Sequence, residues 1–254
     1  MKVKDVISII EGYAPLELQA DFDNSGMQVC FEEDEVRGVL LCVDVTPAVI
    51  DEAAAKGANM VISHHPVLFN PVKKIVAGGF VSDVILKAAA ARVSIYSAHT
   101  NLDCVLGGLN DFLAGALGID VDIERAGEGE YYRIGTVHGS LTFGQFAEKC
   151  SKTVGAGVRT IGDRDKVIAT ALVSTGAGGG DRDMFAMCMR GEADVVVTAE
   201  VRHDVAVACA QAGLCVVELT HYDSEKCARN ILAGLLGSKG VDCLFASEKS
   251  PYNE

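Results

Sequence analysis

Short apolar runs alternate with longer stretches of helical spacing along the first hundred residues. The run 36–43 (VRGVLLCV) is continuous and rich in β-branched side chains, as in a strand that is covered on both faces. Thr46 then stands at an N-cap position and Pro47 at the first helical position, and apolar residues recur at helical spacing until Gly57. The elements predicted next are strands at 60–62 and 93–96 and a helix at 82–91. This alternation predicts a parallel sheet with crossover helices.

The second half of the chain repeats this order. A strand is predicted over 167–173, a glycine-rich turn follows, and Asp181 is placed to cap a helix that runs to about Arg190. The elements predicted after it are a strand at 193–198, a helix at 205–212 and a strand at 215–217. We therefore predict the α/β fold class, with two related α/β domains and mostly parallel sheets.

The two halves align through their histidines. The stretch 193–198 aligns without a gap with 58–63, which sets Ala199 and Glu200 at the positions of His64 and His65. By the same order, His221 is the counterpart of His99. Between the halves, residues 120–135 carry charges, glycines and two tyrosines, a composition that suits a boundary or an exposed connection.

The composition is that of a globular chain. Of the 254 residues, 49% are hydrophobic and 22% are charged, which excludes a disordered chain and a collagen-like repeat. Lysine and arginine number 22 against 35 aspartates and glutamates, which gives a formal net charge of −13. Because this balance repels phosphodiester backbones, we expect no nucleic-acid partner.

Cysteine usage and the apolar runs indicate a cellular compartment. The nine cysteines include no Cys-x-x-Cys pair, which excludes a zinc ribbon or a thioredoxin-type motif and disfavours a disulfide framework. The run 6–10 near the N-terminus is too short for a signal sequence, and no run reaches the length that spans a membrane. We therefore expect a cytoplasmic protein that uses most of its thiols as small buried side chains.

Four of the six histidines follow predicted strands: His64, His65, His99 and His221. In parallel α/β sheets, the carboxyl edge of the strands is where ligands bind. Each half also places a carboxylate four residues after a histidine, Asp103 after His99 and Glu225 after His221. Imidazole nitrogen and carboxylate oxygen together suit a divalent transition-metal ion.

Each of these signals has a plainer explanation when it is taken alone. An adjacent histidine pair is compatible with a solvent-facing loop, and a His–carboxylate spacing of four residues with an ordinary surface pair on a helix. Their shared position at one sheet edge, in both halves of a repeat, favours a metal site, because independent surface residues would scatter.

Three other motifs keep two interpretations each. His203, three residues after Glu200, either supports the site or belongs to a polar helix start. The stretch 175–180 either cradles phosphate with backbone N–H groups or forms a plain flexible turn. The loop 21–26 is a turn by composition or a site loop.

Five strings carry a resemblance to a known family. After DNSG at 23–26, the chain has SHHP at 63–66, AHTNLD at 98–103, TAEVRH at 198–203 and HYDSE at 221–225. In this order they resemble the Nif-three-like family, many members of which are labelled GTP cyclohydrolase I type 2 homologues. The resemblance covers nearly the whole chain.

The resemblance implies a domain arrangement and an assembly. We expect a first α/β domain at 1–126 with 222–254, and a second α/β domain at 127–221 inserted into it. The length matches the short form of the family, without the extra middle domain of longer members. A homohexameric ring, with metal sites that face an internal cavity, is also implied.

The resemblance further implies a dinuclear centre that holds two divalent ions per chain, with Zn, Fe, Mn, Ni or Co as candidates. The implied metal ligands are His64, His65, Asp103, His221 and Glu225. We expect Glu225 to bridge the ions, because five protein ligands serve two ions only if a carboxylate is shared. His99 and His203 are the expected proton carriers.

Three positions depart from the family pattern. Thr220 and Ala199 stand where the family has glycine, and Phe22 stands where tryptophan is usual. None of the three changes removes a ligand. The larger side chains in place of glycine narrow the pocket, so the resemblance specifies the metal more firmly than the substrate.

A pair of divalent ions activates water for hydrolysis, and we expect a hydrolase of a nucleotide-like or other small anionic substrate. The reaction either opens a purine ring or cleaves a phosphate ester. Two alternatives remain: a metal-binding or metal-delivery module without catalysis, and a regulatory ring with structural metals that binds a protein partner. Hydrolysis requires an open coordination position, whereas structural ions are fully ligated.

Overall fold

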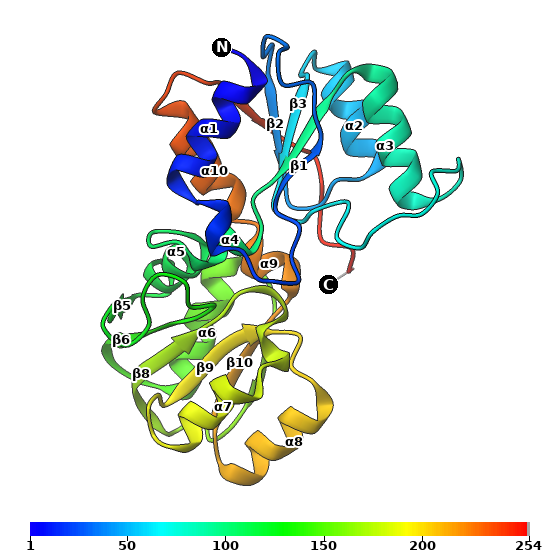
Figure 1. Cartoon of the computed structure of the whole chain (residues 1–254). Helices are drawn as coiled ribbons and strands as arrows, with labels where there is room; N and C mark the ends of the chain where they lie inside the picture. The colour runs from blue at the N-terminus through cyan, green and yellow to red at the C-terminus, as the bar shows by residue number, and fades with distance from the viewer. Residues whose placement is uncertain (253–254) are drawn as a thin grey trace. The chain divides into compact units, whose positions relative to one another are not determined.

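The computed structural model describes residues 1–252, which form two compact units (Figure 1). The first unit comprises 1–105 and 228–249, and the second comprises 106–227 and 250–252. These limits differ from the expected domain limits at 126/127 and 221/222. The reason is sheet pairing, because Ile119–Val121 joins the second sheet by pairing with 135–137. Similarly, the segment 221–227 contacts the second unit through Ser224, whose Oγ accepts the Gly176 N–H at 3.0 Å.

The first unit contains a five-stranded sheet in the order β1-β4-β3-β2-β11. Its strands are β1 (Gly26–Val29), β2 (Val39–Cys42), β3 (Met60–Ser63), β4 (Ser94–Ser97) and β11 (Cys243–Phe245). Its helices are α1 (Val3–Tyr13), α2 (Pro47–Ala55), α3 (Phe80–Ala91), α4 (Thr100–Cys104) and α10 (Ala228–Gly237). All neighbouring strands pair in parallel except β1, which is antiparallel to β4.

Local chemistry accounts for the elements of this unit. Thr46 caps α2 by accepting the Val49 N–H at 3.2 Å, and Pro47 occupies the first helical position, as the sequence predicted. Strands β2, β3 and β4 are buried along their whole length, because helices cover both faces of the sheet (Figure 1). Helices α2 and α3 pack on one face through Ile50 and Val84.

The second unit contains a six-stranded sheet in the order β5-β6-β8-β9-β10-β7. Its strands are β5 (Ile119–Val121), β6 (Arg133–Thr142), β7 (Arg159–Ile161), β8 (Val167–Val173), β9 (Val195–Ala199) and β10 (Cys215–Leu219). Its helices are α5 (Leu109–Ala116), α6 (Phe143–Val154), α7 (Arg182–Met189), α8 (His203–Ala212) and α9 (His221–Glu225). Strands β8, β9 and β10 are parallel, and the outer pairs are antiparallel.

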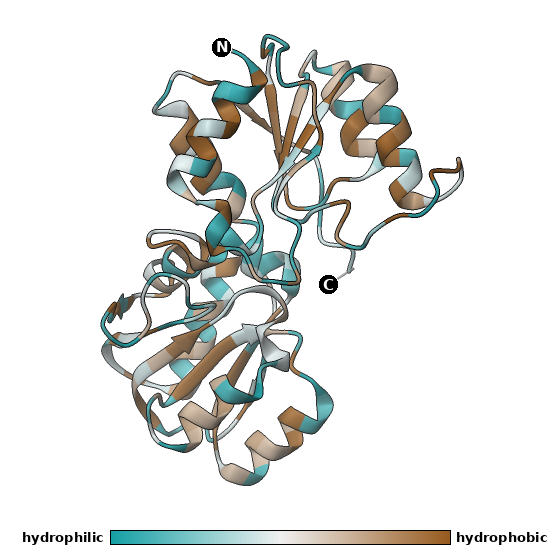
Figure 2. Cartoon of the chain, in the orientation of Figure 1, coloured by the Kyte–Doolittle hydropathy of each residue, from teal (hydrophilic) through white to brown (hydrophobic). Residues whose placement is uncertain are grey.

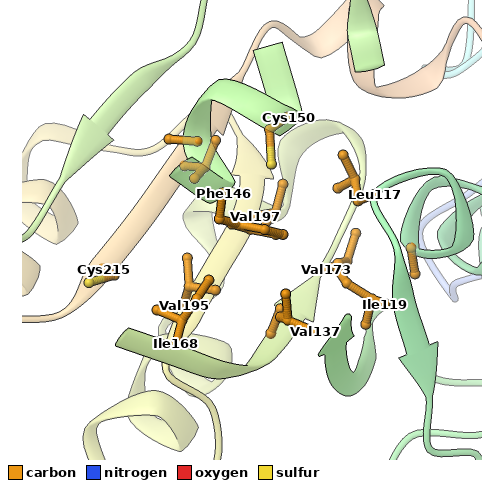
Figure 3. Close-up of a cluster of buried hydrophobic side chains, with 14 of the residues drawn as sticks. Leu117, Ile119, Val137, Phe146, Cys150, Ile168, Val173, Val195, Val197 and Cys215 are labelled. Carbon is orange, nitrogen blue, oxygen red and sulfur yellow. The ribbon is translucent and has the colours of Figure 1, made fainter. Parts of the chain in front are cut away.

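Alternating side chains of this sheet form two cores. Val195 and Val197 point to the face covered by α6, where they pack with Phe146 and Cys150 (Figure 3). Val196, between them, points to the opposite face, which α7 and α8 cover. This two-residue period is expected of a strand that is buried on both sides. Figure 2 shows the strands as hydrophobic and the helices as carrying both hydrophobic and hydrophilic residues.

The two units repeat one topology. The first runs α1-β1-β2-α2-β3-α3-β4-α4 and the second α6-β7-β8-α7-β9-α8-β10-α9. The corresponding strand orders, β1-β4-β3-β2 and β7-β10-β9-β8, are identical, and each unit adds different strands beyond β2 or β8. The structure confirms the predicted α/β class with two related halves. It also shows that residues 120–135 are more than a connection, because Asp120 lies in β5 and Gly135 in β6.

The structure bears on two expectations from the sequence, the absence of a membrane-spanning helix and the burial of most cysteine thiols. Within residues 1–252, no helix is both long and apolar enough to cross a bilayer. Six of the nine cysteines are buried, as expected of small apolar side chains. Burial raises the pKa of the Cys150 thiol and of the Cys188 thiol to about 12. Those two thiols therefore stay protonated at neutral pH.

Candidate functional site

Four histidines lie where parallel strands end. His64 and His65 follow β3, His99 joins β4 to α4, and His221 is the first residue of α9 after β10. The carboxyl ends of parallel strands share one edge of a sheet, so the first three residues gather at the edge of the first sheet. The fourth occupies the equivalent edge of the second sheet.

His64 is fully buried and held from the neighbouring strand end. Its Nδ1 lies 2.8 Å from the carbonyl oxygen of Ala98. On the other side of the ring, Nε2 lies 3.7 Å from Oδ1 of Asp103, a carboxylate of the short helix α4. A neutral imidazole carries one N–H, and in His64 this N–H is at Nδ1, because the Ala98 carbonyl oxygen can only accept a hydrogen bond. Nε2 therefore directs its lone pair toward Asp103, as in a pair of ligands that share a cation.

His65 is held by a carboxylate at the end of β2. Its Nδ1 lies 2.8 Å from Oδ1 of Asp44. The backbone at that strand end is itself fixed, because Glu248 accepts the N–H groups of Val43 and Asp44 at 2.6 and 3.1 Å. The C-terminal part of the first unit thus supports the orientation of the His65 ring.

His99 is held by a carboxylate from the loop before β1. Its Nδ1 lies 2.7 Å from Oδ1 of Asp23, while Oδ2 of Asp23 accepts hydrogen bonds from Thr100 and Ser25. Burial raises the pKa of the Asp23 carboxyl, but these hydrogen bonds outweigh it and keep that pKa well below its ordinary value. Asp23 is therefore a stable anion that orients the imidazole.

The three histidines of the first unit form one cluster. A ring nitrogen from each of His64, His65 and His99 lies within 4.8 Å of the other two. Their ring centroids are 5.1 to 5.5 Å apart. Because each Nδ1 faces an oxygen acceptor, Nε2 is the ligand atom that each ring offers. This convergence suits a transition-metal ion, and it groups His99, a predicted proton carrier, with two predicted ligands.

The second unit supplies a fourth histidine of the same kind. Nδ1 of His221 lies 2.8 Å from Oε1 of Glu200, and Nε2 lies 3.0 Å from Oε2 of Glu225. The Glu225 carboxylate is nearly fully buried on α9, which begins with Thr220 accepting the Asp223 N–H. Two oxygen acceptors thus face one imidazole, an arrangement satisfied by an imidazolium or by a cation between Nε2 and Glu225.

The glycine-rich stretch 175–180 packs against this pair. A Cβ on Gly176, whose φ is +60°, would lie 2.1 Å from Oε1 of Glu225. The Thr175 N–H donates to Oδ1 of Asn110 and the Gly176 N–H to Oγ of Ser224. Both N–H groups are thus engaged within the fold. Close approach to Glu225 accounts for glycine at 176 without a phosphate ligand.

A cavity of about 540 Å³ in the second unit has His221 in its wall. Glu200, Thr220 and Glu218 also line it, together with Arg159, whose guanidinium bonds Glu218 at 2.6 Å and is mostly exposed. The volume is in the range of small-molecule sites. The cavity therefore leaves the His221 ring accessible to a small molecule, and the Arg159 guanidinium lies in the cavity wall.

His203 belongs to the second unit and is not one of the three histidines of the first unit's cluster. It is the exposed first residue of α8. Its neighbour Glu200 is instead the group that orients His221. The sequence did not predict that Asp44 supports His65 or that Asp23 supports His99. Each aspartate nevertheless has a recognisable position, since Asp44 ends a predicted strand and Asp23 lies in a polar turn.

Comparison with known proteins places this geometry in a family. A sequence model described as Duf34/NIF3 (NGG1p interacting factor 3) matches residues 1–251. Two similar proteins are named GTP cyclohydrolase 1 type 2 homolog. That of Clostridium acetobutylicum is 32% identical over 235 residues (89% of this chain and 85% of the relative), and that of Clostridium perfringens is 31% identical over 234 residues (89% and 87%).

Solved structures agree with the whole fold. A Bacillus cereus protein related to NIF3 has a TM-score of 0.89 at 23% identity, covering 100% of this chain and 99% of the other. Reduced HcgD from Methanocaldococcus jannaschii has a TM-score of 0.84 at 26% identity, covering 98% of both chains. The resemblance seen in the sequence motifs is confirmed: this chain belongs to the Duf34/NIF3 family.

Proposed function

We propose that this protein is a divalent-metal-dependent hydrolase of a nucleotide-like or other small anionic substrate. One observation carries the proposal: four histidines at strand ends each turn Nδ1 to an oxygen acceptor, so that Nε2 is the atom directed at a metal ion or, in His99, at a proton. The ligands in this proposal are His64, His65, Asp103, His221 and Glu225, which hold two divalent ions per chain.

The donor set fits a transition metal. It consists of imidazole nitrogens and carboxylate oxygens, which suit Zn, Fe, Mn, Ni or Co. Burial of the Glu225 carboxylate beside an imidazole is costly unless positive charge compensates it. A divalent ion supplies that charge. The same argument applies to Asp103, whose side chain is only 15% exposed beside fully buried His64.

When bound, the ions supply Lewis-acid chemistry and activate water. The chain supplies orientation. Asp44 and Glu200 fix the rings of His65 and His221, and Asp23 fixes that of His99. We assign His99 the role of carrying a proton at Nε2, because Asp23 holds its ring through Nδ1 and the ring is outside the ligand set. His203, on the exposed start of α8, stays a prediction that a His203→Ala variant tests.

The substrate class is supported by the cavity next to His221 and by the names of the relatives. The charge of Arg159 in the cavity wall is paired with Glu218, and Glu200 adds a further carboxylate to a chain whose net charge is −13. In this proposal an anionic substrate is therefore attracted by the bound ions, against the overall field. The relatives' name directs the first assay to GTP. We also propose the homohexameric ring that the family resemblance implies, which analytical ultracentrifugation tests.

The test combines metal content with turnover. His64→Ala/Glu225→Ala should lose both ions by elemental analysis while its far-ultraviolet circular dichroism is unchanged. Retention of two ions per chain would contradict the ligand set. The matched control is His138→Ala/Glu148→Ala, a pair on the exposed surface of the second unit. Metal-loaded protein is then assayed with GTP and a panel of phosphate esters, with product chromatography. Absence of turnover with every compound favours a metal-binding module instead.

A further inference from the structure

A second cavity, in the first unit, adjoins the histidine cluster and is lined by aromatic rings. Its volume is about 480 Å³, and the side chains of Phe22, Asp23 and Phe69 form part of its wall. Asp23 connects it directly to the cluster, because the same carboxylate binds Nδ1 of His99. Phe69 adds a second connection, since its ring centroid lies 6.0 Å from that of His99.

The two phenylalanines are exposed although they are paired. Phe22 is 69% exposed and Phe69 is 42% exposed. Their ring centroids are 6.3 Å apart at an interplanar angle of 66°, an edge-to-face pair. Holding two large rings in water beside a cavity forgoes the free energy that burial would give. A planar ligand that enters the cavity recovers it.

The loops that carry these rings are braced against each other. The Gln28 amide, 9% exposed, donates to the carbonyl of Asn24 at 2.7 Å and accepts the Leu68 N–H at 3.0 Å. The Asn24 amide donates in turn to the carbonyl of Leu68 at 2.9 Å. Two of these hydrogen bonds join Leu68, in the loop after β3, to Asn24 and Gln28, and the third holds Gln28 of β1 to Asn24 in the loop before it. The cavity between the rings is therefore formed before a ligand binds.

We propose that this cavity is a binding subsite for a planar heteroaromatic ring, such as a purine base. Aromatic faces bind such rings by stacking, whereas a sugar or phosphate gains nothing comparable. The amides of Asn24 and Asn70 in the wall offer donors and acceptors to a polar ring edge. The proposal rests on the proposed function only in assigning the bound ring to the substrate.

The chain contains no tryptophan, which permits a direct test. Phe22→Trp places a single indole in the cavity wall and keeps an aromatic ring there. GMP should quench its fluorescence along a saturable curve, and ribose 5-phosphate should not. The matched control is Phe80→Trp, a single indole at a position 60% exposed at the start of α3 and outside the cavity wall. It should show only linear, collisional quenching.

A second substitution tests the role of the partner ring. Phe69→Leu in the Phe22→Trp background keeps apolar bulk and removes stacking, and it should weaken GMP binding at least tenfold. Equal linear quenching in both single-tryptophan proteins overturns the proposal. Equal saturable quenching by ribose 5-phosphate also overturns it, because binding would then depend on the phosphate. No effect of Phe69→Leu overturns it as well, because binding would then not depend on stacking.

The titrations are made with chelator and repeated with added Mn²⁺. Stacking in the cavity predicts saturable quenching in both conditions. Failure of the metal assay or of turnover therefore leaves this result unchanged. Conversely, a metal-loaded, active protein without saturable quenching refutes the subsite and leaves the proposed function standing.

Discussion

At the scale of single residues, the site depends on carboxylates that orient the histidine rings. Asp44, Asp23 and Glu200 each bind the Nδ1 of a histidine that lies 21, 76 and 21 residues away in the chain. Such partners fix the tautomer and the ring orientation, which sets the direction of the Nε2 lone pair. Metal affinity should therefore respond to them nearly as it responds to the ligands.

Asp44→Ala tests this at His65. The side chain of Asp44 is about half exposed, so the fold should tolerate its removal. Without the anchor the His65 ring loses its fixed orientation, and metal affinity should fall roughly 10- to 100-fold. Competition against a fluorescent chelator measures the change. Asp51→Ala is the control, since it removes an exposed α2 carboxylate that binds Lys87; equal affinity in the two variants would argue against a supporting role.

Gly176→Ala tests the approach of the glycine-rich turn to Glu225. The new Cβ would lie 2.1 Å from Oε1 of Glu225. The alanine backbone would also have to adopt a φ of +60°. We expect a loss of roughly 1–3 kcal/mol of unfolding free energy from the strained backbone, together with loss of metal from a displaced Glu225. Urea unfolding and elemental analysis measure the two effects.

Gly213→Ala separates the strain from the clash. Gly213 has a φ of +70° at the end of α8, and a Cβ there meets no atom within 4 Å. This variant should lose a similar amount of stability and keep its metal. If both variants keep their metal, the close approach at Gly176 has no role in holding Glu225.

At the scale of elements, local sequence signals determine where several helices begin, whereas some strands depend on tertiary contacts. Thr46 and Asp181 cap α2 and α7 as the sequence predicted, because capping depends on neighbours within three residues. Helix α6 begins with a capping box at Thr142 and Gln145, which is a local signal of the same kind. Strand β6 gives no comparable signal, because Gly135 and Gly139 interrupt its apolar pattern.

The Asp194 carboxylate adds hydrogen bonds to the backbone pairing of β8 with β9, and Asp194→Asn tests their contribution. Oδ2 of Asp194 accepts the N–H groups of Ala169 and Thr170 at 2.9 and 3.0 Å. Burial raises the pKa of this carboxyl, but these hydrogen bonds outweigh it and lower the pKa. A carboxyl with a lowered pKa stabilises the folded state at pH values above its unfolded-state pKa of about 3.9. This stabilisation is lost as the pH falls through the folded-state pKa.

Asp194→Asn should therefore cost about 1 kcal/mol at pH 7, a figure reduced for partial exposure, and the cost should shrink as the pH falls below about 4. Urea unfolding of both proteins at pH 7 and pH 3.5 measures it. Asp165→Asn, on the exposed loop before β8, should show no such dependence. A cost that is constant with pH would mean that the charge of Asp194 does not contribute.

At the scale of the whole molecule, the repeat is the main organising feature. Each unit places a short helix after its third parallel strand, α4 or α9, and each short helix carries a buried or nearly buried carboxylate, Asp103 or Glu225. The second unit has Glu200 where the first has His65, and this glutamate supports a histidine rather than replacing one. The two units thus share one topology and differ in the side chains at the ends of their parallel strands.

The sequence by itself determined the order of the parallel strands and their helices, the relation of the halves and the four strand-end histidines. These features follow from residue period, capping and motif, which act over short distances in the chain. Only the tertiary structure decided the unit limits, the antiparallel strands at the sheet margins, the partners of each imidazole and the braced aromatic cavity. Those depend on contacts between distant segments, and such contacts exist only after the sheets have formed.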